Sequence, residues 1–358
     1  MRRIALLTLA LATCLPTLVD ANPPPRFPPG AVWHQNISAA PLHPNSASMI
    51  STLAGLGGWG NGNRFQIDFS LQTYPEAPAG TPMRAIIPHV PSGEYTIPDC
   101  EELPASMPVP ADAAFEGQSG LTCDNENEDC HLLVRQGHLL YELYGGNFSG
   151  GVLNAMCLVV WNLSAIYPPE GRGDHCTSAD AAGFPIAPLL VNADEVAAAV
   201  NVANSDLGHA IRFILPNARM ANDPSLGGRY GRLYVRPATH AGGPSGPSGS
   251  VPYGARLRLK SNFDMSGYSA AAQVILRTMQ RYGIVLADGG NIALTFENDR
   301  YTTANWDSLG IEPRTFVDAD NPVLVTDFDI IDTGARIAET YECERTTVSD
   351  VIFADGFE

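Results

Sequence analysis

Short apolar runs of period two, separated by turns rich in glycine and proline, constrain the fold of this 358-residue chain more than any other feature. The run RFQIDFSLQTY at 64–74 places Phe65, Ile67, Phe69 and Leu71 on one face, which is the pattern of a half-buried strand. The 34 glycines and 29 prolines favour turns and keep the regular elements short. We therefore expect a mainly β protein.

Further strands and two helices are expected along the chain. CHLLVRQGHLLYELYGG predicts two strands joined near Gln136-Gly137, and IVLADGGNIALTFEN predicts a hairpin about Asp288-Gly289-Gly290. Helices are predicted at 192–205, where Asn192 can cap, and at 269–283, where apolar residues recur at helical spacing. The remaining strands are expected at 83–90, 155–167, 209–217, 231–240, 254–263 and 324–332.

These elements favour one β-rich domain. The strands do not alternate regularly with helices, which disfavours a parallel α/β sheet. We expect an antiparallel β-sandwich or jelly-roll-like domain over 64–343, with two or three short inserted helices. The strand at 324–332 resembles the one at 64–74 in composition, and the two are expected to be neighbours. An extended lead-in rich in proline and glycine is expected over 22–63, and a tail over 344–358.

The N-terminal residues predict export. Two arginines, a short apolar stretch and Val19-Asp20-Ala21 have the form of a signal peptide over 1–21, cleaved after Ala21. The apolar stretch is shorter than the roughly 20 residues that span a bilayer. A lipid-bearing Cys14 is the weaker alternative. We expect a secreted or periplasmic protein with no membrane partner.

The cysteines agree with an oxidising compartment. Of seven, Cys14 leaves with the signal peptide, and an even number remains, which predicts three disulfides. Cys123 and Cys130 flank one short loop and are expected to pair. The sequence does not determine how the other four cysteines pair with one another: Cys100, Cys157, Cys176 and Cys343.

Charge and motifs exclude several functions. The net charge of −17 repels phosphate backbones, so no nucleic-acid partner is expected. No G-x-S-x-G, H-E-x-x-H, P-loop or dinucleotide fingerprint is present, and we expect neither a cofactor nor a metal. Asp124, Glu126 and Glu128 alternate as Ca²⁺ ligands can, but without an EF-hand pattern, which favours a solvated loop. The expected state is a monomer.

Polar residues at expected strand ends are the candidate catalytic groups: Asp180, His209, His240 and Asp288. Arg212 lies near them, as a substrate-binding candidate. If the strand ends converge, two carboxyl groups and a histidine share a cleft, as acid/base cleavage of a sugar bond requires. The alternative is that each residue holds a turn or a core position. Asp180 in TSADAAGFPIAP (177–188) is the residue that turn geometry explains least.

A second candidate is the basic stripe of Arg256, Arg258 and Lys260. Period two places the three side chains on one face of a strand, with Leu257 and Leu259 toward the core. Such a stripe can bind an acidic sugar. The alternative is a solvated strand face.

Between about 64 and 330 the chain resembles a family of exported, largely uncharacterised proteins of bacteria and some fungi. The residues that carry the resemblance are TSADAAGFPIAPLLVNADEV, GHAIRF, YVRPATHAGG, YGARLRLKSNFDMSGY and QRYGIVLADGGN. The resemblance implies export and one structural unit, but no activity.

Two functions remain open. The first is a secreted carbohydrate-active or cell-wall-active enzyme with carboxylate/histidine chemistry, acting on an anionic or neutral polysaccharide. The second is a non-catalytic extracellular binding or surface protein. The enzyme interpretation requires that the catalytic candidates share one cleft. A spread beyond about 12 Å exceeds the spacing of the paired carboxyl groups of glycosidases.

Overall fold

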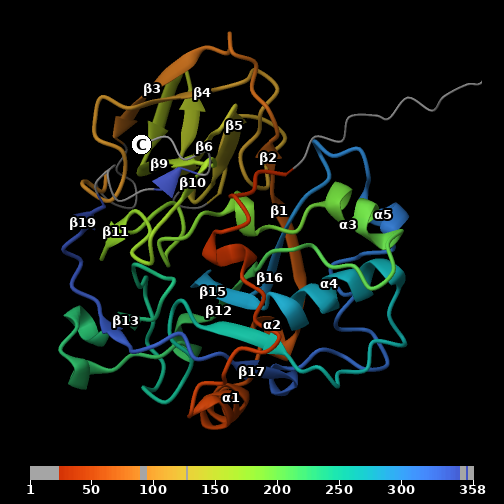
Figure 1. Ribbon diagram of the computed structural model, residues 1–358. Helices are drawn as coiled ribbons and strands as arrows, with labels where there is room; N and C mark the ends of the chain where they lie inside the picture. The colour runs from red at the N-terminus through yellow and green to blue at the C-terminus, as the bar shows by residue number, and fades with distance from the viewer. Residues whose placement is uncertain (1–23, 89–94, 126–127, 347–351, 354–358) are drawn as a thin grey trace, which may run out of the picture.

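A six-stranded mixed sheet forms the centre of the larger, lower part of the molecule in Figure 1. The computed structural model describes residues 24–88, 95–125, 128–346 and 352–353. The expected signal peptide and most of the last eight residues lie outside them. In spatial order the strands are β1 (Ile67–Leu71), β16 (Leu294–Glu297), β12 (Ile211–Leu215), β15 (Ile284–Gly289), β14 (Arg256–Leu259) and β17 (Phe328–Ile330).

This sheet corrects the expected fold class. β1 pairs with β16 in parallel, and β12 pairs with β15 in parallel, while β14 is antiparallel to both its neighbours. The fold is therefore a mixed α/β arrangement and not an antiparallel sandwich. The hairpin expected about Asp288 is wrong, because β12 lies between β15 and β16. β1 and β17 are the two edges of the sheet and not neighbours.

The two predicted helices both begin where the sequence predicts. In α4 (Ala270–Arg281) the Ser269 side chain caps the first turn, and the expected apolar face is fully buried. In α3 (Ala193–Val200) Asn192 and Glu195 form a reciprocal capping box. α3 and α4 contact each other at the right of Figure 1, and α4 also contacts β14. The other helices are α1 (Ser46–Gly55), α2 (Gly60–Asn63) and α5 (Trp306–Leu309).

A smaller β-rich part with its own apolar core lies above the central sheet in Figure 1. Phe115, Leu132, Val134 and Leu143 are among its buried residues. One sheet has the order β2 (Thr73–Tyr74), β5 (Leu132–Gln136), β6 (Leu139–Tyr144), β9 (Cys157–Asn162). The other has the order β4 (Ser106–Pro108), β3 (Met83–Pro88), β8 (Val152–Ala155), β7 (Asn147–Ser149). The expected antiparallel pair about Gly137 is present as β5 and β6.

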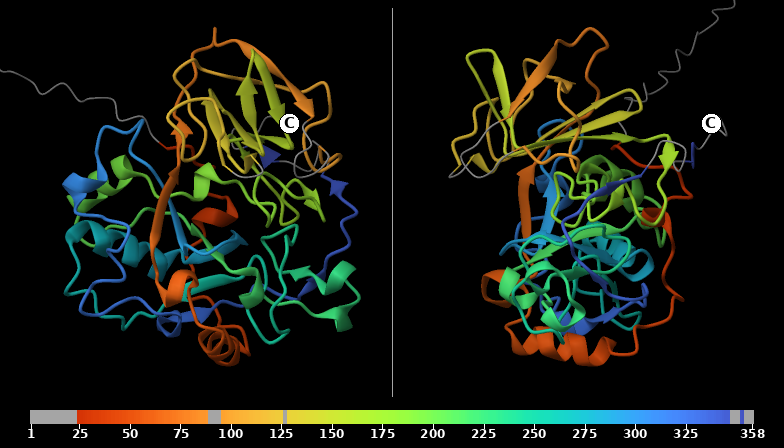
Figure 2. Two further views of the ribbon diagram at one scale, coloured as in Figure 1. Left: turned by 180° about the vertical axis from the view of Figure 1, so that it is seen from behind. Right: turned by 90° about the vertical axis from the view of Figure 1, so that its left-hand side faces the viewer.

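One continuous segment joins the two parts. β1 belongs to the central sheet and β2, two residues later, to the upper sheet, and the rear view in Figure 2 shows this segment rising between them. At the junction Glu297 is buried and accepts a hydrogen bond from the Thr73 amide (3.0 Å) and one from Asn192 (2.9 Å). These bonds connect the ends of β16 and β2 to the start of α3.

Short elements complete the fold. The two-stranded pairs are β10 (Ala165–Ile166) with β20 (Ile352–Phe353), β11 (Gly173–Asp174) with β19 (Glu344–Arg345), and β13 (Leu233–Tyr234) with β18 (Ile337–Ala338). Single 3₁₀ turns are Val32–His34, Ala187–Leu189, Asn217–Arg219, Pro224–Leu226, Arg229–Gly231 and Val325–Asp327. Part of the expected tail thus pairs with the body of the protein.

The lead-in expected to be extended is helical in its second half. Met49, Ile50 and Leu53 of α1, and Trp59 after it, are buried in the main core, so apolar packing determines the path of this segment. The domain boundaries at 64 and 343 stay predictions. Among the described residues, no helix combines the length and apolar character needed to cross a bilayer.

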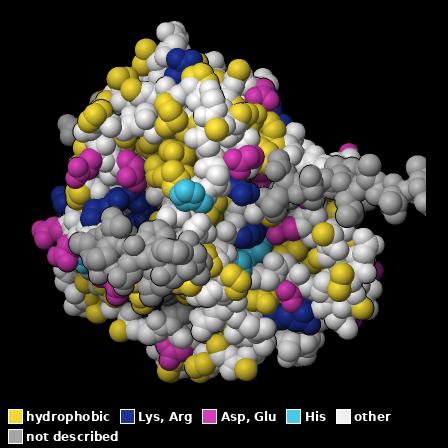
Figure 3. Space-filling model, turned by 45° about the horizontal axis from the view of Figure 1, so that its top comes forward, with side chains coloured by type: hydrophobic (Ala, Val, Ile, Leu, Met, Phe, Trp, Pro, Cys, Tyr) yellow, Lys and Arg dark blue, Asp and Glu magenta, His cyan; other side chains and the backbone are white. Residues whose placement is uncertain are grey.

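The surface drawn in Figure 3 carries acidic and basic side chains interspersed, with hydrophobic side chains gathered over the upper part. The surplus of negative charge is therefore not concentrated on that face.

Candidate functional site

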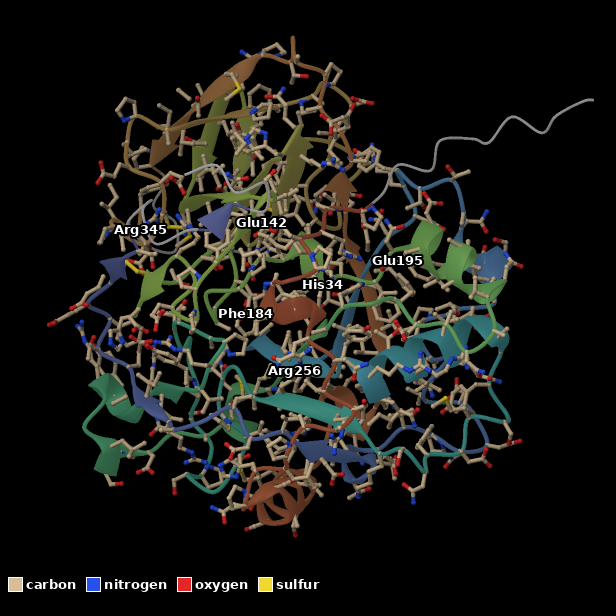
Figure 4. The ribbon with its side chains drawn as sticks, viewed as in Figure 1. His34, Glu142, Phe184, Glu195, Arg256 and Arg345 are labelled. Carbon is tan, nitrogen blue, oxygen red and sulfur yellow. A yellow bond between two sulfur atoms is a disulfide. The ribbon has the colours of Figure 1, made fainter. Side chains whose placement is uncertain are left out.

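The segment 177–188 is held in place by bonds from both parts of the molecule. Glu142 of β6 is fully buried, and its carboxyl group accepts the amides of Ile186 (2.8 Å) and Ala187 (2.8 Å). From the central sheet, the Asp288 carboxyl group accepts the Ala181 amide at 3.2 Å, and within the segment the Ser178 hydroxyl donates to the Phe184 carbonyl at 2.6 Å. Figure 4 shows Glu142 in the upper part and Phe184 below it. The segment is thus a rigid connector between the two parts.

Backbone conformation and close packing both require glycine at position 183. Its φ is +77°, and a Cβ there would lie 2.0 Å from Thr239 Oγ1 and 2.7 Å from the Cys176 carbonyl oxygen. The position therefore excludes other side chains on both conformational and steric grounds. Asp180 also takes part in this turn, because its Oδ1 accepts the Ala182 amide, but its Oδ2 binds Arg212 outside the turn.

A cleft of about 590 Å³ lies between the central sheet and the upper part, with Asp180 in its wall. Asp180, Arg212, His240 and Asp288 all line it, although they come from four separate segments of the chain. The expected convergence of strand-end residues is present for these four. The described residues contain no group of three or more His, Cys, Asp or Glu side chains arranged to hold a metal ion.

A row of polar side chains crosses three strands on the floor of the cleft. Strand pairing aligns Asp68 of β1 with Thr295 of β16. The next strand, β12, brings Arg212 beside Thr295, whose hydroxyl accepts from Arg212 Nη1 at 2.9 Å. Because Phe213 of β12 pairs with Leu294, the apolar neighbours of this row point to the opposite face.

Asp180 and Arg212 form a buried ion pair beside this row. Asp180 Oδ2 accepts from Arg212 Nη2 (2.7 Å) and Nε (3.2 Å), and its Oδ1 accepts the Ala182 amide at 3.2 Å. The Asp180 side chain has no exposed surface. Burial raises the pKa of Asp180 to about 7, against the opposing effect of Arg212. Asp180 therefore fixes Arg212 in the wall of the cleft, with no exposed surface of its own.

Asp288 is half-buried and lines the cleft. Its oxygens accept the main-chain amides of Ala181 (3.2 Å) and Gly289 (2.6 Å). Burial raises the pKa of Asp288, while the charge of Arg212 and the two amides act in the opposite direction. This carboxyl group can thus hold a proton and can also be stabilised once it has lost it.

His240 is fixed by the same residue that binds Asp288. Its Nδ1 lies 2.7 Å from the Ala181 carbonyl oxygen, which can only accept, so Nδ1 carries a hydrogen. In neutral His240 the Nε2 atom is therefore an acceptor, and it has no hydrogen-bond partner among the residues that the structure describes. Backbone dimensions and the two bonds to Ala181 place Asp288 Oδ2 and His240 Nδ1 within about 10 Å of each other.

The opposite wall carries a second ion pair, which the sequence did not reveal. His131 Nδ1 lies 2.6 Å from Glu116 Oε2, and Nε2 lies 2.9 Å from the Ala179 carbonyl. Both partners are acceptors, so both ring nitrogens donate and His131 is protonated. Burial opposes this charge, but Glu116 outweighs it and raises the pKa of His131 to about 9. For Glu116, burial acts to raise the pKa, but the charge and hydrogen bond of His131 outweigh burial and lower it.

Ser70 links this pair to the floor of the cleft. Its hydroxyl lies 2.9 Å from both Glu116 Oε1 and Asp68 Oδ2. A hydroxyl has one hydrogen, so a protonated Asp68 satisfies both contacts. Burial raises the pKa of Asp68, in agreement with that arrangement. The cleft thus contains carboxyl groups with unlike proton affinities.

His209 does not line the cleft. Its side chain is fully buried, and its Nε2 lies 3.3 Å from Glu195 of α3, which also pairs with Arg26 at 2.8 Å. Figure 4 shows Glu195 on the side of α3, away from Glu142 and Phe184. His209 and Arg212 are three residues apart, and along an extended segment this separation places them on opposite faces.

Arg256, Arg258 and Lys260 also lie outside this cleft. Arg256 is buried and donates to the carbonyls of residues 32 and 35 and to that of Tyr282, while Arg258 donates to three carbonyls between residues 37 and 40. Lys260 donates to the Thr326 carbonyl at 2.7 Å. Leu257 and Leu259 are buried, as predicted. The arginines attach the N-terminal segment to β14.

Three disulfides are present: Cys100–Cys157, Cys123–Cys130 and Cys176–Cys343. The expected number and the Cys123–Cys130 pair are confirmed, and they are consistent with an oxidising compartment. The loop between Cys123 and Cys130 contributes Asn125 and Asp129 to the cleft, while Glu126 lies outside the described residues.

The residues that the sequence did not reveal are Asp68, Ser70, Glu116, His131 and Thr295. Asp68 and Ser70 had a signal, since they occupy the polar face of the alternating run at 64–74. No sequence pattern indicated Glu116 or His131, because Glu116 lies in a long connection and His131 directly follows a disulfide loop.

The chain matches no protein-family model, no curated protein and no solved structure. Its function is therefore argued from the geometry of the cleft.

Proposed function

We propose that this protein is a secreted carbohydrate-active enzyme that cleaves glycosidic bonds in the cleft between its two parts. One observation carries the proposal. The Ala181 amide binds Asp288, whose carboxyl group has a raised pKa. The Ala181 carbonyl binds His240 through Nδ1, which leaves the His240 Nε2 atom free of any partner among the described residues. Acid/base cleavage requires a proton donor and a proton acceptor in one cleft.

The roles follow from the environment of each group. Asp288 donates its proton to the leaving glycosidic oxygen. His240 Nε2 accepts a proton from a water molecule, whose oxygen bonds to the anomeric carbon as the bond to the leaving oxygen breaks. The charge of Arg212 stabilises the Asp288 carboxylate that forms, and solvent returns the proton from His240 to Asp288. Asp180 has a positioning role, because its contacts are with Arg212 and the main chain.

The cleft also suits a polyhydroxylated ligand. Its volume of about 590 Å³ falls within the roughly 300–1,000 Å³ of ligand sites. Its walls offer a donor, Arg212, and acceptors, Glu116 and Asp288, as sugar hydroxyl groups require.

The test is incubation of purified protein with plant, fungal and bacterial wall polysaccharides, followed by mass spectrometry of the products. Asp288→Asn should lower the turnover rate by about 100-fold or more, because general acid catalysis contributes about 10²–10⁴-fold. Asp318→Asn is the matched control, since Asp318 is exposed and pairs with Arg314 away from the cleft.

Binding of a polysaccharide without product, by wild-type protein, would reject the enzyme and support the alternative of a non-catalytic binding protein. Turnover by the Asp288→Asn variant at the wild-type rate would reject the assigned role of Asp288.

A further inference from the structure

A cluster of two arginines and two tyrosines lies beside the cleft and has no part in the chemistry above. We define it as the Arg–Tyr cluster: Arg229, Tyr230, Arg232 and Tyr341. The Arg229 and Arg232 guanidinium groups lie 5.2 Å and 5.3 Å from the centre of the Tyr230 ring. The same groups lie 5.9 Å and 5.4 Å from the Tyr341 ring. Each tyrosine ring therefore contacts both cations.

Among the residues that the structure describes, no carboxylate pairs with the arginines of this cluster. Arg232 donates to the Tyr341 hydroxyl, and Arg229 lies 3.4 Å from the Tyr230 hydroxyl. Within the described ranges, neither guanidinium group forms an ion pair with a carboxylate. The nearby Glu339 is fully buried, and its carboxyl group binds His175 (3.2 Å) and the Ala241 amide (3.0 Å). In a chain of net charge −17, two unpaired adjacent cations are unusual.

Tyr230 is presented to solvent by a backbone that a tyrosine rarely adopts. Its φ is +57°, and 67% of its surface is exposed. Tyr341 also has a positive φ, of +62°. Left-handed backbone is unfavourable at a residue with a side chain, because Cβ approaches the following carbonyl oxygen. Exposure and strain together in one aromatic residue are features of binding sites and not of packing.

The cluster is continuous with the wall of the cleft. The Tyr341 ring lies 5.1 Å from the His240 ring in an edge-to-face arrangement. The Tyr341 hydroxyl donates to the Ala241 carbonyl at 2.8 Å, so the residues after His240 are bound to the cluster. A chain of sugar residues that passes His240 can therefore reach Tyr230.

We infer that the Arg–Tyr cluster is a binding subsite for a sugar residue that bears a carboxylate, which makes the substrate class an acidic, uronate-containing polysaccharide. Planar guanidinium groups bind carboxylates through paired hydrogen bonds, and an exposed tyrosine ring offers a face for the sugar ring. The substrate assignment rests on the proposed function, but binding at the subsite can be measured without turnover.

The test uses oligogalacturonate of about ten residues and a neutral malto-oligosaccharide of equal length, with affinities measured by calorimetry on full-length protein at low and high salt. Arg229→Gln/Arg232→Gln should weaken oligogalacturonate binding by about 30-fold at low salt, because two charge-assisted contacts are lost. The loss should be smaller at high salt, since exposed charges are screened. Arg314→Gln, on the surface and outside the cluster, is the control and should leave both affinities unchanged.

The outcomes separate the two proposals. Equal affinity of wild-type protein for the acidic and neutral ligands, binding of neither, or a change below threefold in the double variant overturns the subsite. Selective binding of oligogalacturonate that the double variant loses, without products from wild-type protein, supports the subsite and rejects the enzyme. Products that form equally well with the double variant support the enzyme and reject the subsite.

Discussion

Removal of the Asp180 carboxyl group should destabilise the protein strongly, because it leaves a buried guanidinium group without its counter-ion. In Asp180→Ala, Arg212 loses two hydrogen bonds and keeps the Thr295 hydroxyl at 2.9 Å. Breaking a buried ion pair from one side costs about 3–5 kcal/mol. Asp288 lies close enough to act on Arg212 and supplies a second negative charge. We therefore expect the free energy of unfolding to fall by about 3 kcal/mol, the lower end of this range.

The companion variant is Asp180→Ala/Arg212→Met. It removes the stranded charge together with its partner, and replacement of a whole buried pair by apolar groups is often close to neutral. We therefore expect the double variant to unfold at a higher urea concentration than Asp180→Ala alone. Such a result corresponds to a large coupling energy between the two residues in a double-mutant cycle.

The assay is urea unfolding with intact disulfides, followed by circular dichroism and tryptophan fluorescence. A change in midpoint at constant slope reports stability. Asp318→Ala, at an exposed pair, should leave the midpoint unchanged. A wild-type midpoint for Asp180→Ala, or additive losses in the cycle, would show that the pair does not hold the cleft as described.

Three further predictions concern other contacts. Gly183→Ala should lower the free energy of unfolding, measured in urea, clearly more than Gly150→Ala does. Both glycines have positive φ, but only at position 183 would the new Cβ meet Thr239, so equal losses would contradict this explanation. His131 has a folded pKa of about 9, against about 6.5 unfolded, so its charge stabilises the folded state below about pH 6.5 and this contribution is lost as pH rises through 9. His131→Gln should therefore flatten the decline of unfolding free energy over that range, and parallel pH profiles would oppose the assignment. Arg258→Met should lower the midpoint of thermal unfolding, because three carbonyls between residues 37 and 40 lose a donor, whereas an unchanged midpoint would indicate a free surface charge.

Local signals in the sequence were sufficient for α3, α4 and most strands, but not for α1 in the segment expected to be extended. α3 and α4 begin at Asn192 and Ser269 because a capping side chain and the helical spacing of apolar residues act within one or two turns. The disulfide between Cys123 and Cys130 was also predictable, since the short loop holds the two sulfurs close. Each of these features depends on residues near one another in the chain.

The order of the strands was not predictable from the same signals. Asp288-Gly289-Gly290 has the composition of a hairpin turn, yet β12 separates β15 from β16. Alternation along β14 was correctly identified, but the face with Arg256 and Arg258 is covered by residues 32–40 and not by solvent. An alternating pattern shows which residues share a face, but not what packs against the polar one.

By itself the sequence determined the composition of most elements, the oxidising environment expected for its cysteines, and the identity of four candidates that line the cleft: Asp180, Arg212, His240 and Asp288. Only the tertiary structure decided that His209 faces away, that Glu116 and His131 form the opposite wall, and that Ala181 brings Asp288 and His240 together. The physical reason is range. Caps, turns and side-chain periodicity are fixed by neighbouring residues, whereas a cleft is formed by burial of apolar surface between segments more than a hundred residues apart, and that free energy depends on the whole chain.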